Sequence, residues 1–363
     1  MSGRSPVTRR SILAALGSSV ALGGLSGCTG SITGSTTGSE PDTLRVGTYK
    51  SFVDAPSTSA GDWVKSEFDS RTDYTLEWVI RENEINDFIQ RRQAGASLEA
   101  DAYLGVTPQD LVRADTNLDD PLFEGFETGE IGNTDNIEDA YQFDPDRRVL
   151  PTGASHVALV YDETAVSEPS TFESLTDPSF EDTLLLANPQ STTTGLLFLL
   201  WTINTVGRDS YLDYWQRLMD NGVNVLGSWG DAYNAYTQAE GDMVVSYSTD
   251  QVYAAAEDQD MARHQIGFVN DQGYAYVDGL AKFATTDRDG LVRTFADFLL
   301  EPDVQRKTAV ENVGIPTVSN ASLPEDIRQY AHVPDESVQF SYDTLVDNMS
   351  DWREAWARQV AGN

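Results

Sequence analysis

Apolar residues recur with a period of two in three segments near the start of the chain, a pattern that predicts β-strands. These segments are TLRVGTYKSF at 43–52, YTLEWVI at 74–80 and ADAYLGV at 100–106. Helical periodicity lies between them at 63–68 and at 85–93, where Ile85, Phe88 and Ile89 share one face. Strands that alternate with helices favour a parallel α/β sheet, whose ligands gather at the carboxyl ends of its strands. Those ends fall at 49–51, 81–83 and 105–108.

A second α/β series follows along the chain. Its predicted strands lie at 156–163, 182–189, 242–248 and 273–283, and its predicted helices at 194–206, 211–219, 231–238, 291–300 and 345–358. We expect two α/β lobes joined by crossing segments at 156–163 and 273–283, with a hinge and a ligand cleft between the lobes. The first lobe takes 43–155 and, after the return crossing, the rest of 273–363 with its C-terminal helices. The second lobe takes 164–272.

Four consecutive hydroxyl residues precede the most apolar of these helices. Ser191, Thr192, Thr193 and Thr194 are followed by Gly195 and the run LLFLLW. One hydroxyl is enough to cap a helix. The unpaired N–H groups and the positive end of a helix dipole also favour phosphate or carboxylate oxygens. The stretch is therefore either a cap with polar neighbours or a seat for an anionic part of a ligand, and the pattern alone leaves both readings open.

The first 28 residues have the pattern of an export signal rather than of a folded element. Arg9 and Arg10 precede a weakly apolar stretch, which is typical of the twin-arginine export route. L-S-G-C at 25–28 resembles a lipobox, and Cys28 is the only cysteine in the chain. We expect a lipid on Cys28, a flexible Gly/Ser/Thr-rich tether at 29–42, and a soluble body held at the extracellular face of the cell membrane.

The charge balance is strongly acidic. The chain has 58 acidic and 24 basic residues, a net charge of -34, and four of the basic residues are lysines. Acidic, lysine-poor surfaces resemble those of proteins from extreme halophiles, where salt screens the self-repulsion. An apolar content of 40% with seven tryptophans argues for a packed core rather than a disordered acidic chain. Such a field disfavours nucleic acid as a partner.

Several stretches, taken together and in order, resemble the thiamine-binding lipoproteins and periplasmic proteins that serve ABC importers. They are VGTYKSF at 46–52, ADAYLGV, NPQSTTTGLLFLLW at 188–201, GSWGDAYNAYTQAEGDMVVSYSTDQVY at 227–253 and GIPTVSNASLP at 314–324. The resemblance implies a two-lobed, type II periplasmic-binding-protein-like fold. It also implies an extracytoplasmic component that captures thiamine or its phosphates, works with an ABC transporter permease, and uses no cofactor.

The resemblance also suggests a binding site. Relatives stack the thiamine cation between aromatic faces, and the matching positions are Tyr49, Trp229, Tyr247 and Tyr253. Thr192 and Thr193, with Ser191 beside them, match hydroxyl positions that hold the hydroxyethyl or phosphate end of the ligand. Thr107, at a strand end, completes the polar set.

Two positions depart from the pattern of the relatives. Lys50 stands where relatives commonly have an acid, and Val313 stands where a tryptophan is expected. Asp250 or Asp278 could restore the negative charge near the cation.

Other functions remain as alternatives. Thiaminase I shares the fold but needs a cysteine nucleophile, and Cys28 lies outside the predicted fold, so we expect no enzyme activity and no catalytic residue. His156, His264 and His332 form no motif typical of a hydrolase or a metal site, and we expect no bound metal. The main alternative is a binder of another solute, such as a polyamine, a ferric complex or a different cationic heterocycle. In either case we expect a monomer.

Overall fold

The computed structural model describes residues 42–54 and 59–361. These residues all belong to one folded unit. The predicted signal and the lipidation site Cys28 lie outside the described residues, as does the predicted tether except for its last position.

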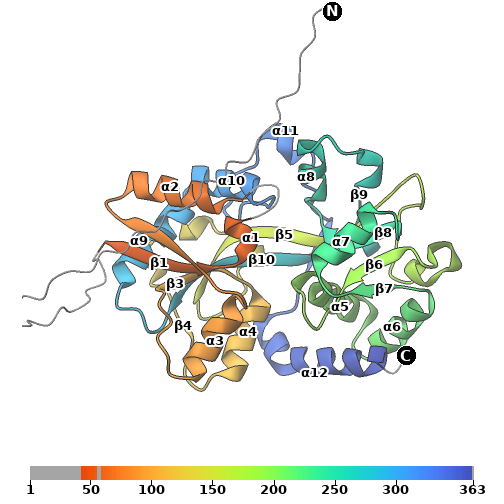
Figure 1. Ribbon diagram of the computed structural model, residues 1–363, viewed down its shortest axis with the longest axis horizontal. Helices are drawn as coiled ribbons and strands as arrows, with labels where there is room; N and C mark the ends of the chain where they lie inside the picture. The colour runs from red at the N-terminus through yellow and green to blue at the C-terminus, as the bar shows by residue number, and fades with distance from the viewer. Residues whose placement is uncertain (1–41, 55–58, 362–363) are drawn as a thin grey trace, which may run out of the picture. The chain divides into compact units, whose positions relative to one another are not determined.

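The described strands and helices follow the predicted alternation closely (Figure 1). The strands are β1 (Thr43–Thr48), β2 (Thr75–Ile80), β3 (Ala102–Val106), β4 (Phe123–Glu124), β5 (Val149–Tyr161), β6 (Leu184–Ala187), β7 (Asn224–Leu226), β8 (Met243–Tyr247), β9 (Gln265–Gly267), β10 (Gln272–Phe283) and β11 (Glu336–Val338). The α-helices are α1 (Lys50–Val53), α2 (Gly61–Arg71), α3 (Ile85–Gln93), α4 (Pro108–Asn117), α5 (Thr193–Val206), α6 (Tyr211–Asp220), α7 (Trp229–Thr237), α8 (Asp250–Ala256), α9 (Asp289–Leu299), α10 (Pro302–Glu311), α11 (Glu325–Arg328) and α12 (Tyr342–Ala361).

Two long antiparallel strands, β5 and β10, form the centre of the sheet. The strand order is β2-β1-β3-β10-β5-β8-β6-β7, and Figure 1 shows β5 and β10 side by side between the two groups of shorter strands. β1, β2 and β3 are parallel to one another, as are β6, β7 and β8. The two predicted crossing segments are thus parts of β5 and β10. Hydrogen bonds run through both crossings, so the two strand groups are joined in one sheet. The division of the chain into lobes stays a prediction.

The register of β10 determines which strand ends face each other. Val106, the last residue of β3, is opposite Gly279, whereas Tyr247, the last residue of β8, is linked through Val157 to Tyr274. β3 runs antiparallel to β10, while β8 is antiparallel to β5 and therefore runs with β10. The carboxyl ends of β3 and β8 consequently point toward each other across 274–279. A ligand position at strand ends is expected there.

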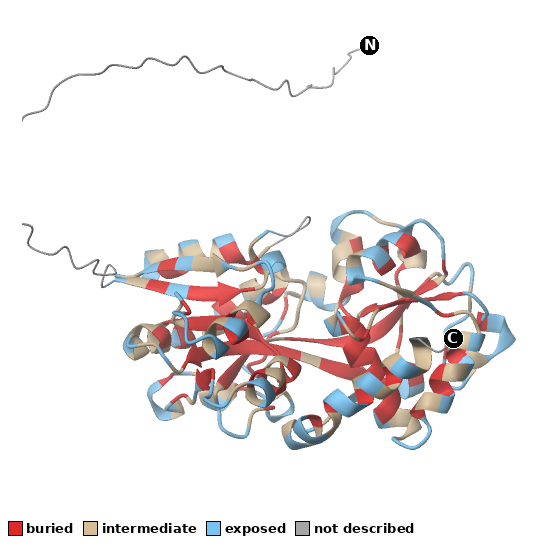
Figure 2. Ribbon diagram, turned by 60° about the horizontal axis from the view of Figure 1, so that its bottom comes forward, coloured by how far each residue is buried: buried red, intermediate tan, exposed pale blue. Residues whose placement is uncertain are grey.

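Two separate apolar clusters cover the sheet, one on each side of the facing strand ends. Around β1 to β3, Leu44, Phe68 and Phe295 are fully buried. Around β5, β6 and β8, the apolar face of α5 contributes Phe198 and Trp201, also fully buried. Figure 2 shows β5 and β10 as mostly buried, with exposed residues on the outer faces of the helices. α5 is apolar on nearly all sides because it lies between the sheet and other helices.

Candidate functional site

Tyr276 and Asp278 occupy the stretch of β10 between the facing strand ends. They are two positions apart and so project from the same face of the sheet. The Tyr276 hydroxyl donates a hydrogen bond to Asp278 Oδ2 at 2.8 Å. The ring of Tyr247, at the end of β8, meets the ring of Tyr276 edge to face, with centroids 5.5 Å apart. Two predicted site residues, Tyr247 and Asp278, are thus brought together by Tyr276, which was not predicted.

Tyr49 reaches the same region from the other group of strands. It follows β1, and Asn312 Nδ2 donates a hydrogen bond to its hydroxyl at 2.9 Å. Tyr49 and Asp278 line one small pocket of about 20 Å³. The Tyr49 ring lies against Gly105, whose φ of +106° suits glycine and where a Cβ would lie 2.5 Å from a ring carbon. Gly105 therefore lets the tyrosine ring approach the end of β3.

Asp278 is a buried carboxylate that has no cation beside it among the residues that the structure describes. It is 5% exposed, and within 42–54 and 59–361 no lysine, arginine or histidine forms an ion pair with it. Burial raises the pKa of Asp278 to about 6, with a further increase from the charge of Asp110, while the bond from Tyr276 lowers it. Burial is also the main cause that raises the pKa of Tyr49 and of Tyr276, and the Asp278 charge adds to both. A positively charged ligand here would stabilise the ionised carboxylate.

Trp229 is the first residue of α7 and is 39% exposed. Its indole N–H donates to the Ser246 hydroxyl at 3.2 Å, and its ring lies 5.0 Å from the ring of Tyr233 at an interplanar angle of 31°. Ser228 caps the helix by accepting a bond from the Asp231 N–H. The indole is thus fixed on one side and open on the other, a setting in keeping with the enrichment of tryptophan at interfaces.

Asp250 and Tyr253 lie in α8, and their roles in ligand binding stay predictions. The Asp250 carboxylate accepts a bond from the Tyr233 hydroxyl at 2.7 Å and contacts His264 Nδ1 at 2.7 Å. Both of its oxygens therefore have partners inside the protein, and one of these partners supports Trp229. Tyr253 is half-buried on the same helix. Neither residue lines the pocket of Tyr49 and Asp278, and neither lines a second pocket at the start of α5.

The hydroxyl stretch caps α5 and also lines a second pocket. Thr192 accepts a hydrogen bond from the Gly195 N–H at 3.2 Å and donates one to the Asn188 carbonyl at 2.9 Å. Ser191 donates to the Gly227 carbonyl at 3.3 Å. The pocket measures about 80 Å³, and its lining includes Ser191, Thr192 and Thr193. Thr192 thus both caps α5 and lines the pocket, whereas Ser191 and Thr193 line the pocket without capping the helix.

Thr107 lines this pocket from the opposite group of strands. It is the N-cap of α4, where its hydroxyl accepts from the Asp110 N–H at 3.2 Å and the Asp110 carboxylate accepts from the Thr107 N–H at 3.1 Å. This reciprocal arrangement is a capping box. Thr107 directly follows the last residue of β3, so the pocket begins next to the cluster of Tyr276 and Asp278.

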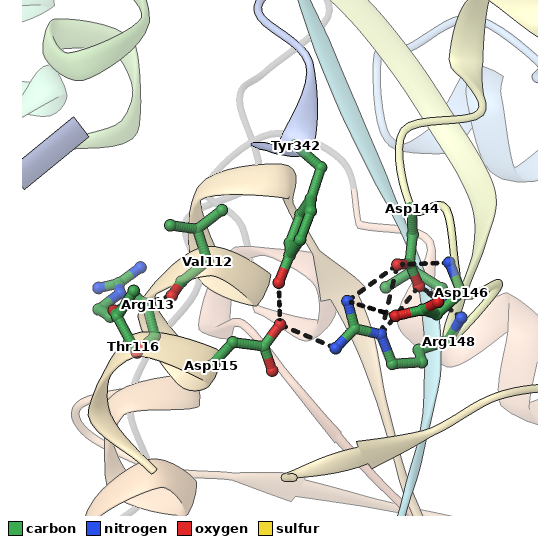
Figure 3. A network of polar contacts seen from close by, with 9 residues as sticks. Val112, Arg113, Asp115, Thr116, Asp144, Asp146, Arg148 and Tyr342 are labelled. Carbon is green, nitrogen blue, oxygen red and sulfur yellow. Dashed lines mark hydrogen bonds and ion pairs between the residues drawn. The ribbon is translucent and has the colours of Figure 1, made fainter. Parts of the chain in front are cut away.

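The C-terminal helix α12 forms the third wall of the pocket through Met349 and Arg353. Its first residue, Tyr342, donates a hydrogen bond to Asp115 of α4, and the same carboxylate pairs with Arg148 at 2.8 Å (Figure 3). Arg148 is also held by Asp144 at 2.9 Å. The Arg148 side chain in this network is 12% exposed. The network fixes the start of α12 against α4. It thereby places the later turns of α12 over the start of α5.

Lys50 and Val313 are the two positions that depart from the pattern of the relatives, and the structure shows what surrounds each. The Lys50 side chain is exposed and lies 3.9 Å from Asp54, while its backbone N–H donates to Glu84 at 3.4 Å. Glu84 therefore brings an acidic group beside Tyr49, and its charge contributes to the raised pKa of Tyr49. Val313 follows α10 with a φ of +52°, next to Asn312. Asn312 is the residue of this segment that contacts the site.

Gly195 is expected to tolerate no side chain, because the start of α5 presses on the loop that follows β6. An added Cβ would collide with the Ala187 carbonyl oxygen and lie 2.8 Å from the Asn188 carbonyl carbon. We expect Gly195→Ala to lower the free energy of unfolding by about 1–3 kcal/mol. Urea denaturation measures this change. Gly290→Ala in α9 is the control, because a Cβ there meets nothing within 4 Å and should stabilise slightly. Equal stability of Gly195→Ala and the unmutated chain would contradict the packing described.

The described residues contain neither a helix long and apolar enough to cross a membrane nor a cluster of three or more potential metal ligands. A family model described as bacterial extracellular solute-binding protein matches residues 63–335, most of the chain. The chain belongs to this family.

This solute-binding protein is similar to proteins with known ligands. It is 26% identical over 324 residues to the thiamine-binding periplasmic protein of Escherichia coli K12, covering 88% of the chain and 93% of the relative. A solved periplasmic thiamin binding protein superposes with a TM-score of 0.74 at 24% identity, covering 88% of this chain and 96% of the other. A ferric binding protein from Campylobacter jejuni has a TM-score of 0.71 at 14% identity, covering 87% and 99%. The predicted type II periplasmic-binding-protein fold is thus confirmed.

Proposed function

We propose that this protein is the extracytoplasmic substrate-binding component of an ABC importer and that it captures thiamine or thiamine phosphates between its two strand groups. A permease in the membrane would receive the loaded protein. The observation that carries the proposal is the buried Asp278 carboxylate, which has no cationic partner in the described chain and is surrounded by Tyr49, Tyr247 and Tyr276.

The chemistry of thiamine suits these residues. Its thiazolium ring carries a permanent positive charge, and its aminopyrimidine is flat. A flat cation gains from a carboxylate and from aromatic faces, each aromatic contact contributing roughly 0.5–2 kcal/mol. Trp229, at the start of α7 beside β6, β7 and β8, supplies an open aromatic face. The names of the relatives support the same ligand, since the protein of Escherichia coli K12 is a thiamine-binding periplasmic protein.

A ligand panel tests the proposal. Thermal unfolding of the purified protein is recorded in high salt with thiamine, thiamine monophosphate, thiamine diphosphate, spermidine or ferric citrate. A ligand that binds only the folded state raises the midpoint by mass action. We expect the thiamine compounds to raise it and the other two to leave it unchanged. A rise with ferric citrate or spermidine alone would support the alternative of another solute, in keeping with the likeness in fold to a ferric binding protein.

We also propose that the protein acts as a monomer tied to the extracellular face of the cell membrane by a lipid on Cys28, after twin-arginine export. In this arrangement the body divides into lobes at the crossings of β5 and β10 as predicted above. The halophile-like charge of -34 would keep such a body soluble in concentrated salt.

Cys28→Ser is expected to release the protein into the medium, because the serine hydroxyl cannot take the place of the lipid-bearing thiol. Immunoblots of cells and medium measure the partition. Export itself should still require Arg9 and Arg10, so Arg9→Lys with Arg10→Lys should leave the protein inside the cell. A Cys28→Ser protein that stays on the cell surface would contradict the lipid anchor.

A further inference from the structure

Two arginines from distant parts of the chain line the larger pocket. Arg113 comes from α4 and Arg353 from α12, and the pocket between them and the start of α5 measures about 80 Å³. Hydroxyl and amide groups of Thr107, Gln190 and Thr192 line other parts of the wall. The hydroxyls of Thr107 and Thr192 and the amide of Gln190 already donate to Asp110, Asn188 and Arg353. The two guanidinium groups are therefore the feature of the wall that suits an anion with several oxygens.

Arg353 has no acidic partner in the described part of the chain. Its Nη2 donates to the Gln190 carbonyl oxygen at 2.6 Å, and Nε is buried without a hydrogen-bond partner. The setting is unusual, because the protein has 58 acidic and only 24 basic residues. Burial lowers the pKa of Arg353, and the charge of Arg113 lowers it further. The two cations are therefore close enough to repel each other, and an anion between them would relieve both effects.

The one acid on the pocket wall, Asp110, is already engaged. Its carboxylate accepts hydrogen bonds from the Thr107 N–H at 3.1 Å and the Thr107 hydroxyl at 2.7 Å, and it pairs with Arg113. Arg113 also donates to Asn86 Oδ1 at 2.9 Å. Asp110 thus neutralises Arg113 in part and leaves the charge of Arg353 uncompensated. The wall carries one positive charge in excess.

The position of the pocket relates it to the proposed cation site. Thr107 on the pocket wall follows Val106, and Val106 is opposite Gly279, the neighbour of Asp278. The cluster of Tyr276 and Asp278 and the pocket of Arg113 and Arg353 are therefore adjacent at the end of β3. One ligand with a cationic end and an anionic end can contact both.

We propose that Arg353, with Arg113 beside it, contacts the phosphate or diphosphate end of the solute, which the resemblance places at Thr192 and Thr193, and that Arg353 determines a preference for phosphorylated over unphosphorylated ligand. The inference rests on the proposed function for the identity of the solute, whereas the pocket itself requires only a phosphoryl anion. Inorganic phosphate and inorganic diphosphate are the other sources of the same chemistry.

Calorimetric titration of the purified protein tests the inference. The ligands are thiamine, thiamine monophosphate, thiamine diphosphate, inorganic phosphate and inorganic diphosphate. The variants are Arg353→Gln, Arg353→Lys, and the control Arg358→Gln, an exposed arginine of the same helix that pairs with Glu354 at 3.4 Å. We expect the unmutated protein to prefer thiamine diphosphate over thiamine. Arg353→Gln should reduce that preference roughly 10- to 100-fold, as expected for a charge-assisted hydrogen bond. Arg353→Lys should retain part of it, and Arg358→Gln all of it.

The outcomes separate the pocket from the proposed function. If thiamine binds but the preference survives in Arg353→Gln, or all forms weaken by one factor, the inference is overturned and the proposed function stands. If no thiamine form binds but inorganic diphosphate binds in a manner that requires Arg353, the pocket is supported and the proposed function fails. If no phosphoryl anion binds at all, the inference is overturned. Thermal unfolding of Arg353→Gln near the unmutated midpoint shows that the variant is folded.

Discussion

Asp278→Asn is expected to weaken the binding of thiamine by about 2–5 kcal/mol, the usual loss when one partner of a buried charge pair is removed. The carboxylate is 5% exposed and accepts a hydrogen bond from Tyr276. No cationic side chain of the described chain pairs with it, so the cation of the ligand would be its partner. Calorimetric titration at neutral pH measures the loss. Asp271→Asn is the matched control, because Asp271 is exposed in the loop before β10. Unchanged affinity in Asp278→Asn would place the cation elsewhere.

The same substitution should stabilise the ligand-free protein. The folded-state pKa of Asp278 is about 6, above the ordinary value of 3.8, so the folded state holds its proton over a pH range where the unfolded state has lost it. The contribution of this group to the free energy of unfolding therefore falls as pH rises from about 4 to about 6. At pH 7 Asn avoids that loss, and Asp278→Asn should be more stable by roughly 2–3 kcal/mol. Urea denaturation measures this gain, and thiamine affinity of the unmutated protein should decrease as pH falls through about 6.

Trp229→Ala is expected to weaken every thiamine form by about 2–4 kcal/mol, because it removes both apolar cover and the attraction of the indole for a cation. The effect should be the same for thiamine and its phosphates, in contrast to Arg353→Gln. Trp229→Phe should keep most of the affinity, and Val333→Ala, at a side chain that is 59% exposed, serves as a control for loss of surface hydrophobicity.

Fluorescence or calorimetric titration gives the affinities of these variants. If Trp229→Ala binds thiamine as tightly as the unmutated protein, the open face of the indole does not contact the ligand. If Trp229→Phe loses as much as Trp229→Ala, the indole N–H bond to Ser246 rather than the aromatic face is the important feature.

Most of the fold was accessible from the sequence because its elements are strongly patterned. The run LLFLLW predicted a helix at 194–206, and α5 spans Thr193–Val206 with Trp201 fully buried. The alternation at 273–283 predicted the return crossing, which is β10 at Gln272–Phe283. Some elements were missed, among them α4, although Leu111 and Val112 lie on its buried face and Thr107 and Asp110 form a capping box. The Thr-Pro-Gln-Asp sequence was an available signal for that helix.

The candidate site was less accessible because it depends on which strand ends meet. Tyr276 looked like one more alternating residue of an apolar strand, and only the pairing of β10 with β5 and β3 places it between Tyr247 and Asp278. Arg113 and Arg353 are far apart in the sequence and share a pocket through the packing of α12 on α4. The role of Asp250 near the ligand stays a prediction, and its contacts with Tyr233 and His264 are of the same tertiary kind. No local pattern reports such tertiary partners.

The most direct test of the account is a calorimetric titration of the purified protein with thiamine in high salt. We expect saturable binding of one thiamine per chain, weakened both by Asp278→Asn and by Trp229→Ala. Absence of binding by thiamine and by both of its phosphates, in a protein that unfolds cooperatively, would contradict the proposed ligand.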